Sequence, residues 1–451
     1  MENKILYERC NKIIWDIATS LKGVVYAKNM TFSVVRLIFL KYITDNCLKA
    51  DNGDKMMNYV RVQKMFAARD NEGGQAAVYP VLQMLDESYG LNNVLTSSLN
   101  EYAKDLFGTD DSWGRKNSNA THYKAIIGSV AELNLEEEPE SNILGKAMVD
   151  CLVATLDIMA RDVVSAGEAV TPSSISTLAA ELMKVHDGET YADFVSGAGL
   201  STLRVVGDAK VKVVNSEINT ECAAVAAMLY IMAGYEDISI TIENSLAKYD
   251  AEQEVADKMF IDAPLNVRKI IEDKNLSSSY LAVEKTVNML KDGGTAVVVV
   301  PGSSLFGMTK VQMEQRRNLV ENKWLKAVIA LPACFYGTGV GMNLMVISKK
   351  ENANILFVNA STNSKFTFSA KEKRITFLTQ EGIAKIAEIV ENGEVISGIS
   401  KFCTIDEVAE TNYDLIPARY ASDIIAEAEE DTVTLKEIDD ELAELYKKLG
   451  L

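Results

Sequence analysis

Two short segments carry the residue types that a nucleoside-binding site needs. Ser196-Gly-Ala-Gly199 follows an apolar run that contains Asp193, and its two glycines lack the Cβ atoms that would keep a ligand away from the backbone. Glu217 ends the next apolar run, at the distance downstream where an acidic residue accepts hydrogen bonds from ribose hydroxyls. Both features also have plainer explanations, because a short glycine turn serves packing and acidic residues are common at strand ends.

Alternating strands and helices must position these residues. After residue 170, short apolar strand candidates alternate with helical segments, which implies parallel βαβ units in a doubly wound α/β sheet. Ligands in such sheets bind at the carboxyl ends of the strands, near the switch in strand order. The predicted strands are 191–195, 212–214, 238–242, 258–261, 296–300, 327–331, 344–348 and 355–358.

The segments on either side of this sheet are predicted to be helical. Up to about residue 165 the apolar residues recur at helical spacing, as at Cys10, Ile13, Ile14 and Ile17, and from about residue 370 the pattern is again helical. We therefore expect a helical N-terminal domain over 1–165, an α/β domain over 166–370, a helical extension over 371–430 and an amphipathic helix over 431–451.

The last of these segments is a candidate partner helix. A capping box of Thr434 and Glu437 precedes it. Its apolar positions alternate three and four residues apart, as in a coiled-coil seam. They are Leu435, Ile438, Leu442, Leu445 and Leu449. This stripe is suited either to a partner helix or to packing on its own domain.

The charge of the chain limits its possible functions. A net charge of −18 and a pI near 4.8 argue against a protein that grips DNA alone, because phosphate contacts need clustered Lys and Arg. The small basic groups at Arg316, Arg317, Lys349 and Lys350 fit a solvated face better than a DNA track. Any nucleic acid therefore requires a basic partner or a local patch.

Metal, disulfide and membrane chemistry are not expected. The six cysteines include no Cys-x-x-Cys pair, and His122 and His186 stand alone, so neither a zinc site nor a disulfide framework is predicted. The N-terminus lacks the apolar core of a signal peptide, and no uninterrupted apolar run of about 18 residues occurs. We expect a soluble protein of the reducing cytoplasm.

Several segments stand in an order and spacing that one protein family shares. They are Trp15-Asp-Ile with Leu21-Lys-Gly23 and Leu37-Ile-Phe-Leu-Lys-Tyr-Ile43, Ile143-Leu-Gly145, Gly167-Glu-Ala-Val-Thr-Pro172, Leu331-Pro-Ala-Cys-Phe-Tyr-Gly-Thr-Gly339 with Asn343-Leu-Met-Val-Ile-Ser-Lys349, and Asn412-Tyr-Asp-Leu-Ile-Pro-Ala-Arg-Tyr420. In this order they resemble the modification subunit of bacterial type I restriction-modification systems, an adenine-N6 DNA methyltransferase. The resemblance covers nearly the whole chain. It implies a Rossmann-like, S-adenosylmethionine-dependent methyltransferase domain behind a helical domain.

The resemblance also implies where S-adenosylmethionine would bind. It assigns six positions to the cofactor: Thr171, Asp193, Gly197, Gly199, Glu217 and Asn244. Three motifs depart from the family. Asp-Phe-Val-Ser-Gly-Ala-Gly replaces Asp-Pro-x-x-Gly-Ser-Gly, and Ala169 and Val170 replace aromatic residues in the lead-in segment. In Glu243-Asn244, Asn244 stands for an Asp that takes the amine of the cofactor's adenine, and its carbonyl can accept one such bond. These losses lower the expected cofactor affinity.

The family's catalytic motif, Asn/Asp-Pro-Pro-Tyr/Phe, is altered as well. Its counterpart here is Asp262-Ala-Pro-Leu265. Asp262 and Pro264 are retained, whereas Ala263 replaces a proline and Leu265 replaces the aromatic residue that stacks on the flipped base. A missing stacking aromatic costs about 1–3 kcal/mol per base. The resemblance therefore implies a methyltransferase site that is weakened for catalysis.

One aromatic pair of the family is intact. Phe335 and Tyr336 stand in a glycine-rich loop after a predicted strand, and the resemblance places this loop on the target-base side of the site. The same loop would also fit a turn that needs glycine torsions, with Tyr336 covering core.

Three functions are compatible with these residues. The leading hypothesis is a catalytically inactive, structural or regulatory subunit, because the lead-in, adenine-binding and catalytic motifs are altered together. It would join a specificity subunit and an active methyltransferase subunit through the helix 435–449 and the helical N-terminal domain, and it would meet DNA only through the complex. The alternatives are an active N6-adenine DNA methyltransferase, in which Phe335 or Tyr336 supplies the stacking, and an oxidoreductase that binds a nicotinamide cofactor at the glycine turn and Glu217.

Overall fold

The computed structural model describes most of the chain. The described ranges are 27–49, 53–69, 74–99, 120–136, 142–162, 171–248, 254–264, 268–271, 274–335, 341–363, 365–372 and 375–422, together with residues 8, 11–12 and 14–15. The expected helix over 435–449 lies outside these ranges, as do Ala169, Val170, Leu265 and Tyr336.

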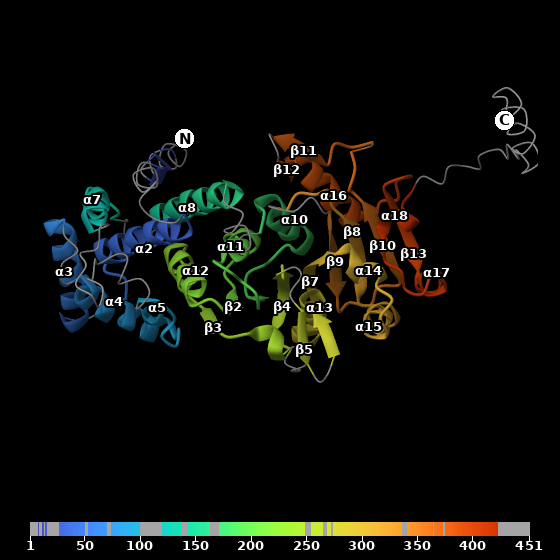
Figure 1. Cartoon of the computed structure of the whole chain (residues 1–451), viewed down its shortest axis with the longest axis horizontal. Helices are drawn as coiled ribbons and strands as arrows, with labels where there is room; N and C mark the ends of the chain where they lie inside the picture. Colours follow the sequence, from blue (N-terminus) through green and yellow to red (C-terminus); the bar gives the residue numbers. More distant parts are fainter. Residues whose placement is uncertain are drawn as a thin grey trace, which may run out of the picture.

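Helices form the N-terminal part of the molecule. They are α2 (Ala27–Asp45), α3 (Gly53–Ala68), α4 (Gly74–Tyr89), α5 (Val94–Ser97), α7 (Ala120–Ala131) and α8 (Ile143–Asp162). The helix α2 is central, because residues 32–40 are all buried and the helix contacts α3, α7 and α8. Figure 1 shows these helices grouped at one end of an elongated molecule. The helical N-terminal region predicted from the sequence is confirmed.

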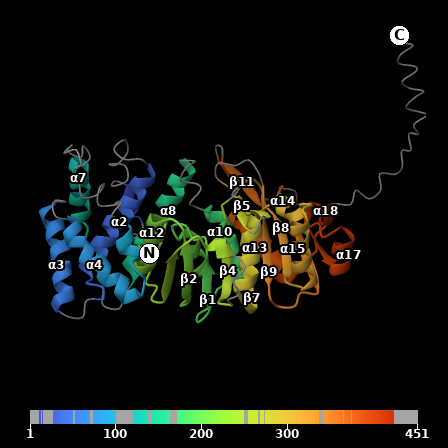
Figure 2. The ribbon, with the colours of Figure 1, turned by 60° about the horizontal axis from the view of Figure 1, so that its bottom comes forward.

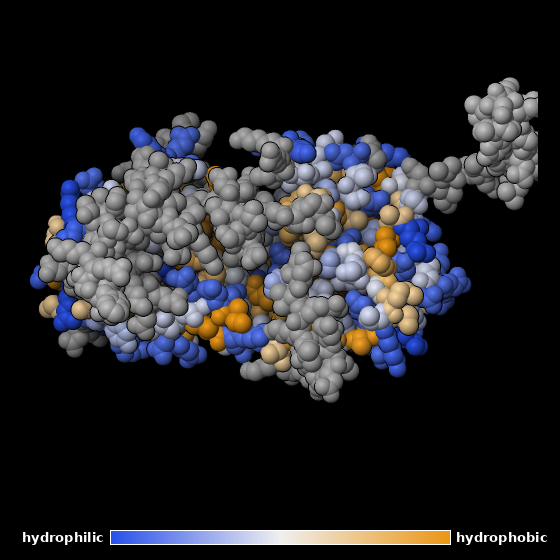
Figure 3. All heavy atoms as spheres, in the orientation of Figure 1, coloured by the Kyte–Doolittle hydropathy of each residue, from blue (hydrophilic) through white to orange (hydrophobic). Residues whose placement is uncertain are grey.

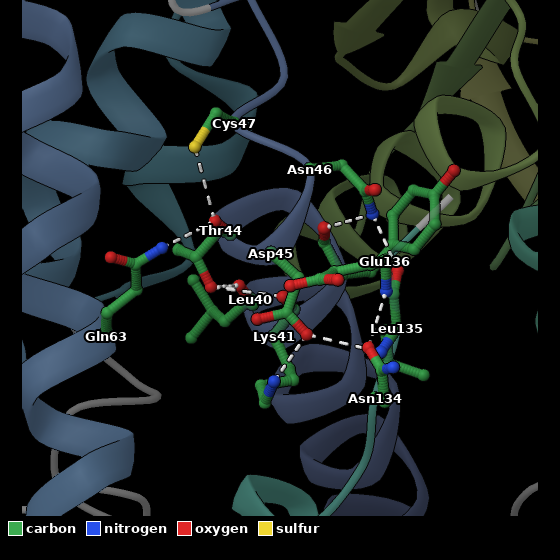
Figure 4. Close-up of polar contacts among 11 residues, drawn as sticks. Leu40, Lys41, Thr44, Asp45, Asn46, Cys47, Gln63, Asn134, Leu135 and Glu136 are labelled. Atoms are coloured by element: carbon green, nitrogen blue, oxygen red, sulfur yellow. Dashed lines mark hydrogen bonds and ion pairs between the residues drawn. The ribbon is translucent and has the colours of Figure 1, made fainter. Parts of the chain in front are cut away.

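Side chains fix the C-terminal end of α2. Asn46 donates a hydrogen bond to the carbonyl oxygen of Leu135 (2.8 Å), and the carboxylate of Asp45 accepts one from the N–H of Leu135 (3.3 Å). From α3, Gln63 donates to the carbonyl oxygen of Thr44 (3.0 Å). Figure 4 shows these contacts converging on the last turn of α2. The helix is thereby tied to α3 and to the segment that follows α7.

A sheet of nine strands forms the larger part of the described fold. In sequence order they are β1 (Thr190–Asp193), β2 (Lys212–Glu217), β3 (Ile238–Ile242), β4 (Ala256–Ile261), β7 (Leu290–Pro301), β8 (Leu325–Ala330), β9 (Met342–Ser348), β10 (Asn354–Asn359) and β13 (Ser400–Thr404). Their spatial order is β13-β10-β8-β9-β7-β4-β1-β2-β3. The pairs that include β9 or β13 are antiparallel, and the other pairs are parallel. The predicted doubly wound α/β fold is confirmed, and its eight predicted strands are all present.

The strand order reverses beside β1. From β1 the chain runs outward to β2 and β3, and it then returns to β4 on the opposite side of β1. In open α/β sheets such a switch point leaves a crevice outside the carboxyl ends of the strands. The register pairs Ala192 of β1 with Met259 of β4. Both strands therefore deliver their carboxyl ends to the same crevice.

Helices cover both faces of the sheet. One layer contains α10 (Ser173–Met183), α11 (Leu200–Val206), α12 (Thr220–Met232) and α16 (Gln380–Asn392), and the other contains α13 (Ser278–Met289), α14 (Gly302–Phe306), α15 (Lys310–Glu321) and α17 (Ile405–Glu410). Side chains alternate between the layers, because successive residues of a strand point to opposite faces. Tyr191 packs under the first layer and Ala192 under the second. Figures 1 and 2 show the sheet between the two layers.

Five of the described strands are not predicted by the hydrophobic pattern of the sequence. Besides β13 they are β5 (Arg268–Ile271), β6 (Lys274–Ser277), β11 (Ser369–Glu372) and β12 (Ile375–Leu378), which form two separate hairpins. The expectation of a purely helical segment after residue 370 is wrong at β12 and β13, although α16, α17 and α18 (Pro417–Tyr420) are present. These strands have four or five residues each and mixed polarity, so they lack the apolar run on which the prediction depends.

The surface of the described part is largely hydrophilic. In the view of Figure 3, hydrophilic residues predominate at the outer helices, and a hydrophobic patch lies in the region of β3. None of the described helices is both long and apolar enough to span a membrane. Two apolar side chains are the most exposed of the large ones described, Met308 at 79% and Ile218 at 65%. Both follow the carboxyl end of a strand of the sheet.

Candidate functional site

The topology gathers the predicted site residues at one edge of the sheet. Asp193 and Glu217 end β1 and β2, Asn244 follows β3, and Asp262 follows β4. Because these strands are parallel, their carboxyl ends share an edge. Phe335 follows β8 and belongs to the same edge on the far half of the sheet. The predicted acidic residues therefore meet at the switch point, and Phe335 stands apart from them.

The glycine turn after β1 has the predicted left-handed torsions. Gly197 has φ 55° and Gly199 has φ 79°, values that residues with a Cβ rarely adopt. A Cβ at Gly199 would lie 2.5 Å from the hydroxyl oxygen of Tyr230 and 2.8 Å from the Cβ of Ala226. At Gly199 the close approach is therefore to α12, which is the packing explanation that the sequence left open.

Glu217 is built into this turn. Its Oε2 accepts a hydrogen bond from the N–H of Gly197 (2.8 Å), and its Oε1 accepts one from the N–H of Asn219 (2.8 Å). Asn219 is the N-cap of α12. The carboxylate therefore lies between the glycine turn and the start of a helix, where it can also meet a hydroxyl-bearing ligand.

Ile218 is a site residue that the sequence reasoning missed. It directly follows Glu217 and is 65% exposed, although it begins the loop between a buried strand and a buried helix. An exposed apolar side chain next to an acidic strand end provides a surface on which the flat ring of a ligand can stack. The signal was available, since an isoleucine follows the acidic residue directly.

Asp193 is buried at the centre of the edge, with an exposed fraction of 3%. Its N–H donates to the side-chain oxygen of Asn215 (3.1 Å), and its carboxylate accepts from the N–H of Val195 (3.0 Å). Burial raises the pKa of Asp193 to about 8, the hydrogen bond from Val195 opposes the rise, and the charges of Glu217 and Asp262 add to it. Three carboxyl groups therefore interact at this switch point.

Asp262 is joined to the lead-in segment. The hydroxyl of Thr171, which precedes α10, donates a hydrogen bond to Oδ2 of Asp262 (2.8 Å). Burial raises the pKa of Asp262 to about 6, and the hydrogen bond from Thr171 opposes the rise. Ala263 is buried in the core of the second layer, and Pro264 is exposed, with its carbonyl oxygen accepting from the hydroxyl of Ser278. The hydroxyl of Thr171, a predicted cofactor-binding residue, is therefore bonded to Asp262, a predicted catalytic residue.

The loop after β3 contacts the turn after β1. Asn244 is exposed, and its carbonyl oxygen accepts from the N–H of Ala247 (3.0 Å). Next to it, the hydroxyl of Ser245 donates to the carbonyl oxygen of Phe194. Asn244 therefore lies at the edge of the candidate site, in the place that the sequence assigns to it.

Phe335 is half-buried and packs against the core of the first layer. Phe335 itself therefore covers core, a role that the plainer explanation of this loop gave to Tyr336. Its neighbour Tyr336 lies outside the described residues. Within those residues, no group of His, Cys, Asp and Glu side chains could hold a metal ion.

Comparison with known proteins identifies the family. The family model of the N-6 DNA methylases matches residues 154–431, which is more than half of the chain. The chain belongs to the N-6 DNA methylase family. The match begins inside α8 and includes every strand of the main sheet. All residues of the candidate site therefore lie within the matched segment.

Several relatives of this chain are methylase subunits of type I restriction enzymes. The MjaVIII subunit of Methanocaldococcus jannaschii is 24% identical over 402 residues, which cover 81% of this chain and 67% of the relative. The MpnII subunit of Mycoplasma pneumoniae is 22% identical over 529 residues, which cover 99% and 95%. The type I methyltransferase subunit of Streptococcus thermophilus has the same fold, with a TM-score of 0.69, 18% identity and coverage of 92% and 100%. The resemblance to type I modification subunits is confirmed.

Two residues that depart from the family motifs take part in the packing around the site. Phe194 stands where the family has a proline, and the ammonium group of Lys285 from α13 lies 5.4 Å from the centre of its ring. Lys285 is itself buried. The second departure, Ala263, fills core instead of shaping the turn as a proline would. The substituted residues thus maintain the core around the site.

Arg316 corrects the interpretation of the basic groups as a solvated face. Its side chain is only 1% exposed, and its Nε donates to the carbonyl oxygen of Tyr413 (2.7 Å). Burial lowers the pKa of Arg316, and the charge of Asp414 opposes the shift. Arg316 therefore anchors the family's last shared stretch, 412–420, whereas its neighbour Arg317 is exposed and pairs with Glu321.

Proposed function

We propose that this member of the N-6 DNA methylase family is a methyltransferase-fold subunit of a type I-like restriction-modification or DNA methylation complex, and that it does not transfer methyl groups itself. The observation that carries the proposal is the contrast within one edge. The backbone turn, Glu217 and the Thr171–Asp262 pair are in place, whereas Leu265 stands where the family has the aromatic residue that stacks on the target base. Such a subunit contributes interfaces and a nucleoside pocket.

The residues present suit S-adenosylmethionine. Its ribose hydroxyls would be held by Glu217, its adenine by the face of Ile218 and the amide of Asn244, and its methionine part by the turn at Gly197. When bound, it supplies a positively charged, electrophilic methyl group. The carboxylates of Glu217 and Asp262 are suited to that positive charge, because opposite charges attract. Burial raises the pKa of Asp193 to about 8, so this carboxyl group is largely protonated near pH 7. This fit rests on the charge and exposure of the chain's own residues.

The same carboxyl groups argue against the oxidoreductase hypothesis. A nicotinamide dinucleotide carries a pyrophosphate, and at a dinucleotide site this group lies against the glycine turn. Here Oε2 of Glu217 already accepts a hydrogen bond from the N–H of Gly197, and Asp193 is buried beside the turn. A second negative group at this place would be repelled instead of bound.

The site after β4 supports loss of catalysis. A methyl acceptor amine needs a fixed polar acceptor and an aromatic surface for the extruded base. Asp262 supplies the acceptor, but Thr171 already donates to it, and Leu265 offers no ring. The base would therefore be held more weakly by about 1–3 kcal/mol, and small displacements at the acceptor reduce catalysis further.

An active adenine methyltransferase is the second candidate. The observation that favours it is the same contact, because the hydroxyl of Thr171 holds the carboxyl group of Asp262 in one orientation. Phe335 stands at the same edge and could contribute stacking with its half-exposed ring. In this case the chain would need no active copy beside it.

The proposed partners are a specificity subunit and an active methyltransferase subunit. The helix over 435–449 and the helical N-terminal domain would provide the contacts, and DNA would be met through the assembled complex. The net charge of −18 supports this arrangement, because such a chain needs a partner to hold a polyanion.

Reconstitution with a specificity subunit tests the proposal. The purified pair is incubated with host DNA and S-adenosylmethionine, and N6-methyladenine is measured with and without an active methyltransferase subunit. We expect methylation only when the active subunit is present. Methylation by the pair alone, abolished by Asp262→Ala, would sink the proposal and establish the active alternative.

Calorimetric titration tests the cofactor pocket separately. We expect binding of S-adenosylmethionine to the wild-type chain and its loss in Glu217→Ala. The matched control is Glu351→Ala, which removes an exposed carboxylate that pairs with Lys323 at the opposite edge of the sheet. Absence of heat with the wild-type chain up to millimolar ligand would contradict a working pocket. The interfaces would then be the subunit's remaining contribution to the complex.

A further inference from the structure

The helix α12 lies between the helical domain and the sheet. Its residues from Cys222 to Met232 are all buried, so the helix is apolar all round, as expected of a helix with neighbours on every side. It contacts α2, α5 and α8 on one side and β2 and β3 on the other. One core cluster includes the helical domain, α12 and these strands. The helical domain and the sheet are therefore packed together mainly through this helix, with further contacts between α5 and β3 and an ion pair between Asp157 of α8 and Arg204 of α11.

The first turn of α12 connects the helical domain to Glu217. Oε1 of Glu217 accepts from the N–H of Asn219, the N-cap, whose side chain accepts from the N–H of Cys222 (3.0 Å). Glu221, in the same turn, lies 3.5 Å from the guanidinium group of Arg36 of α2, which is 3% exposed. A buried cation of the helical domain therefore faces the first turn of α12, whose N-cap Asn219 donates a hydrogen bond to the candidate ribose acceptor Glu217.

The last turns of α12 support the glycine turn from below. The hydroxyl of Tyr230 accepts a hydrogen bond from the side-chain amide of Asn215 (2.8 Å), and a Cβ at Gly199 would collide with it at 2.5 Å. The same amide donates to the hydroxyl of Thr202 in α11 (3.0 Å), and its oxygen accepts from the N–H of Asp193 (3.1 Å). Tyr230 and Asn215 are both buried completely or nearly so.

These contacts converge on the backbone that would hold the cofactor. Asn215 is bonded at once to the end of β1, to α11 and to α12, so it has one arrangement in which all its bonds are made. The hydroxyl of Tyr230 is the member of this network that α12 supplies. Because α12 is fixed by the helical domain, a shift of that domain is transmitted to the hydroxyl and to the turn above it.

We propose that Tyr230 is a positioning residue for the glycine turn, and that α12 couples the helical N-terminal domain to the cofactor pocket. The inference rests on the proposed function, because it concerns the same pocket. Coupling between two sites is reciprocal. A partner that binds the helical domain and shifts α12 therefore changes the affinity for S-adenosylmethionine, and the cofactor changes the affinity for that partner by the same factor.

The experiment compares Tyr230→Phe with Tyr235→Phe in the full chain. Both variants lose one hydroxyl, but that of Tyr235 donates to the carbonyl oxygen of Gly207, at the far end of α11 (3.0 Å). Hydrogen exchange is measured at the backbone amides of 193–199, and binding of S-adenosylmethionine by calorimetry. For Tyr230→Phe we expect faster exchange there and a dissociation constant raised about threefold to tenfold, the factor that corresponds to one hydrogen bond of ordinary net strength. Tyr235→Phe should leave both unchanged, even where it lowers the melting temperature.

The two readouts separate this inference from the proposed function. If the wild-type chain does not bind the cofactor, the proposed pocket fails, and hydrogen exchange still decides the positioning role. If Tyr230→Phe binds as the wild type does and exchanges equally slowly, the positioning role is overturned.

A second pair of variants keeps the coupling testable if Tyr230→Phe does not fold. Arg36→Met removes the buried charge that faces Glu221, and Arg69→Met removes an exposed charge of the same domain that pairs with Glu132. We expect faster exchange at residues 217–222 and 193–199 in Arg36→Met alone, with partial recovery in the double variant Arg36→Met, Glu221→Gln. Exchange in Arg36→Met confined to the helical domain would overturn the coupling.

Discussion

The two halves of the carboxyl edge differ in charge. Acidic residues stand at or just after the carboxyl ends of β1, β2, β3 and β4, at Asp193, Glu217, Glu243 and Asp262. The segments 302–313, 331–341 and 360–371 that follow β7, β8 and β10 contain none, although they include α14 and the first residues of α15 and β11 and are followed by Glu314 in α15 and Glu372 in β11. In a chain with a net charge of −18 such an absence on one half is conspicuous. The first half suits a cation with hydroxyl groups, and the second is the part of the edge where a polyanion meets the least repulsion.

The halves also differ in how their side chains are held. On the acidic half, hydrogen bonds among buried groups determine the positions of the glycine turn and the carboxylates. On the other half, Phe306 and Met308 are 47% and 79% exposed. A preorganised pocket and a surface with exposed apolar side chains are suited to different ligands. The net charge of the whole chain therefore does not predict which ligand either half of the edge is suited to.

The largest effect is expected where the acidic half is packed most closely. Gly199→Ala combines a positive φ with a Cβ 2.5 Å from the hydroxyl of Tyr230, so we expect a loss of about 2–5 kcal/mol in the free energy of unfolding. Gly188→Ala is the control, because φ there is +83° and nothing lies within 4 Å of the added Cβ. It should lose only the torsional part, about 1–2 kcal/mol. Urea unfolding of both variants measures the difference, and equal losses would contradict the packing role of Gly199.

The elements of the sheet could be predicted from the sequence, because each is a local pattern. The eight apolar runs, the glycine turn and the acidic strand ends all lie within a few residues. The direction of β9 could not be predicted, since a run of apolar residues has the same pattern in parallel and antiparallel strands. The contacts that hold the site were equally hidden. Thr171 and Asp262 are 91 residues apart, and Arg316 and Tyr413 are 97 apart.

Gly199 and Arg316 show the same limit for single residues. The sequence suggested a close approach at Gly199 but not that Tyr230 of α12 was the neighbour. It placed Arg316 beside Arg317 as a small basic group, whereas helical geometry sends the two side chains to different faces of α15. Residue type and spacing therefore placed the candidate residues at one edge of the sheet, whereas the partners of each residue depended on long-range packing.

The second largest effect is expected on the half without acidic loops. Arg316→Met leaves the carbonyl oxygens of Tyr413 and Ser304 without their donor in a buried place, so we expect a loss of about 2–4 kcal/mol in the free energy of unfolding. Arg317→Met should cause no measurable change, because Arg317 and Glu321 form an exposed pair. Thermal unfolding of the two variants checks this, and a similar cost for both would show that Arg316 is not an anchor.

The pH dependence of stability sharpens the contrast further. The folded state raises the pKa of Asp193 to about 8, above the ordinary value of about 4 for an aspartate, so folding favours the protonated form. Its contribution is complete below pH 4 and is lost as the pH rises to 8. Asp193→Asn removes this loss, so the variant should gain about 1–3 kcal/mol relative to the wild type between pH 5 and pH 8.

Asp262→Asn is the matched control for that titration. The pKa of Asp262 is raised only to about 6. The gain in stability of Asp262→Asn over the wild type should therefore be smaller and should stop increasing near pH 6. Chemical denaturation at several pH values measures both profiles. Parallel curves for Asp193→Asn and the wild type would show that Asp193 is ionised throughout and that the carboxyl groups do not interact as the structure indicates.

The smallest effect on stability, and the clearest on binding, is expected from the two exposed apolar residues. Ile218→Asp and Met308→Asp alter side chains that are 65% and 79% exposed, so neither should change the free energy of unfolding beyond about 0.5 kcal/mol. Ile218→Asp should weaken S-adenosylmethionine about tenfold by removing a stacking face, and Met308→Asp should leave that affinity unchanged. Conversely, Met308→Asp should weaken DNA binding by the reconstituted complex, because it places an acidic residue on the half that has none, whereas Ile218→Asp should not. Calorimetry and a DNA mobility shift measure the two affinities, and if either variant affected both ligands equally, the division of the edge into two halves would be wrong.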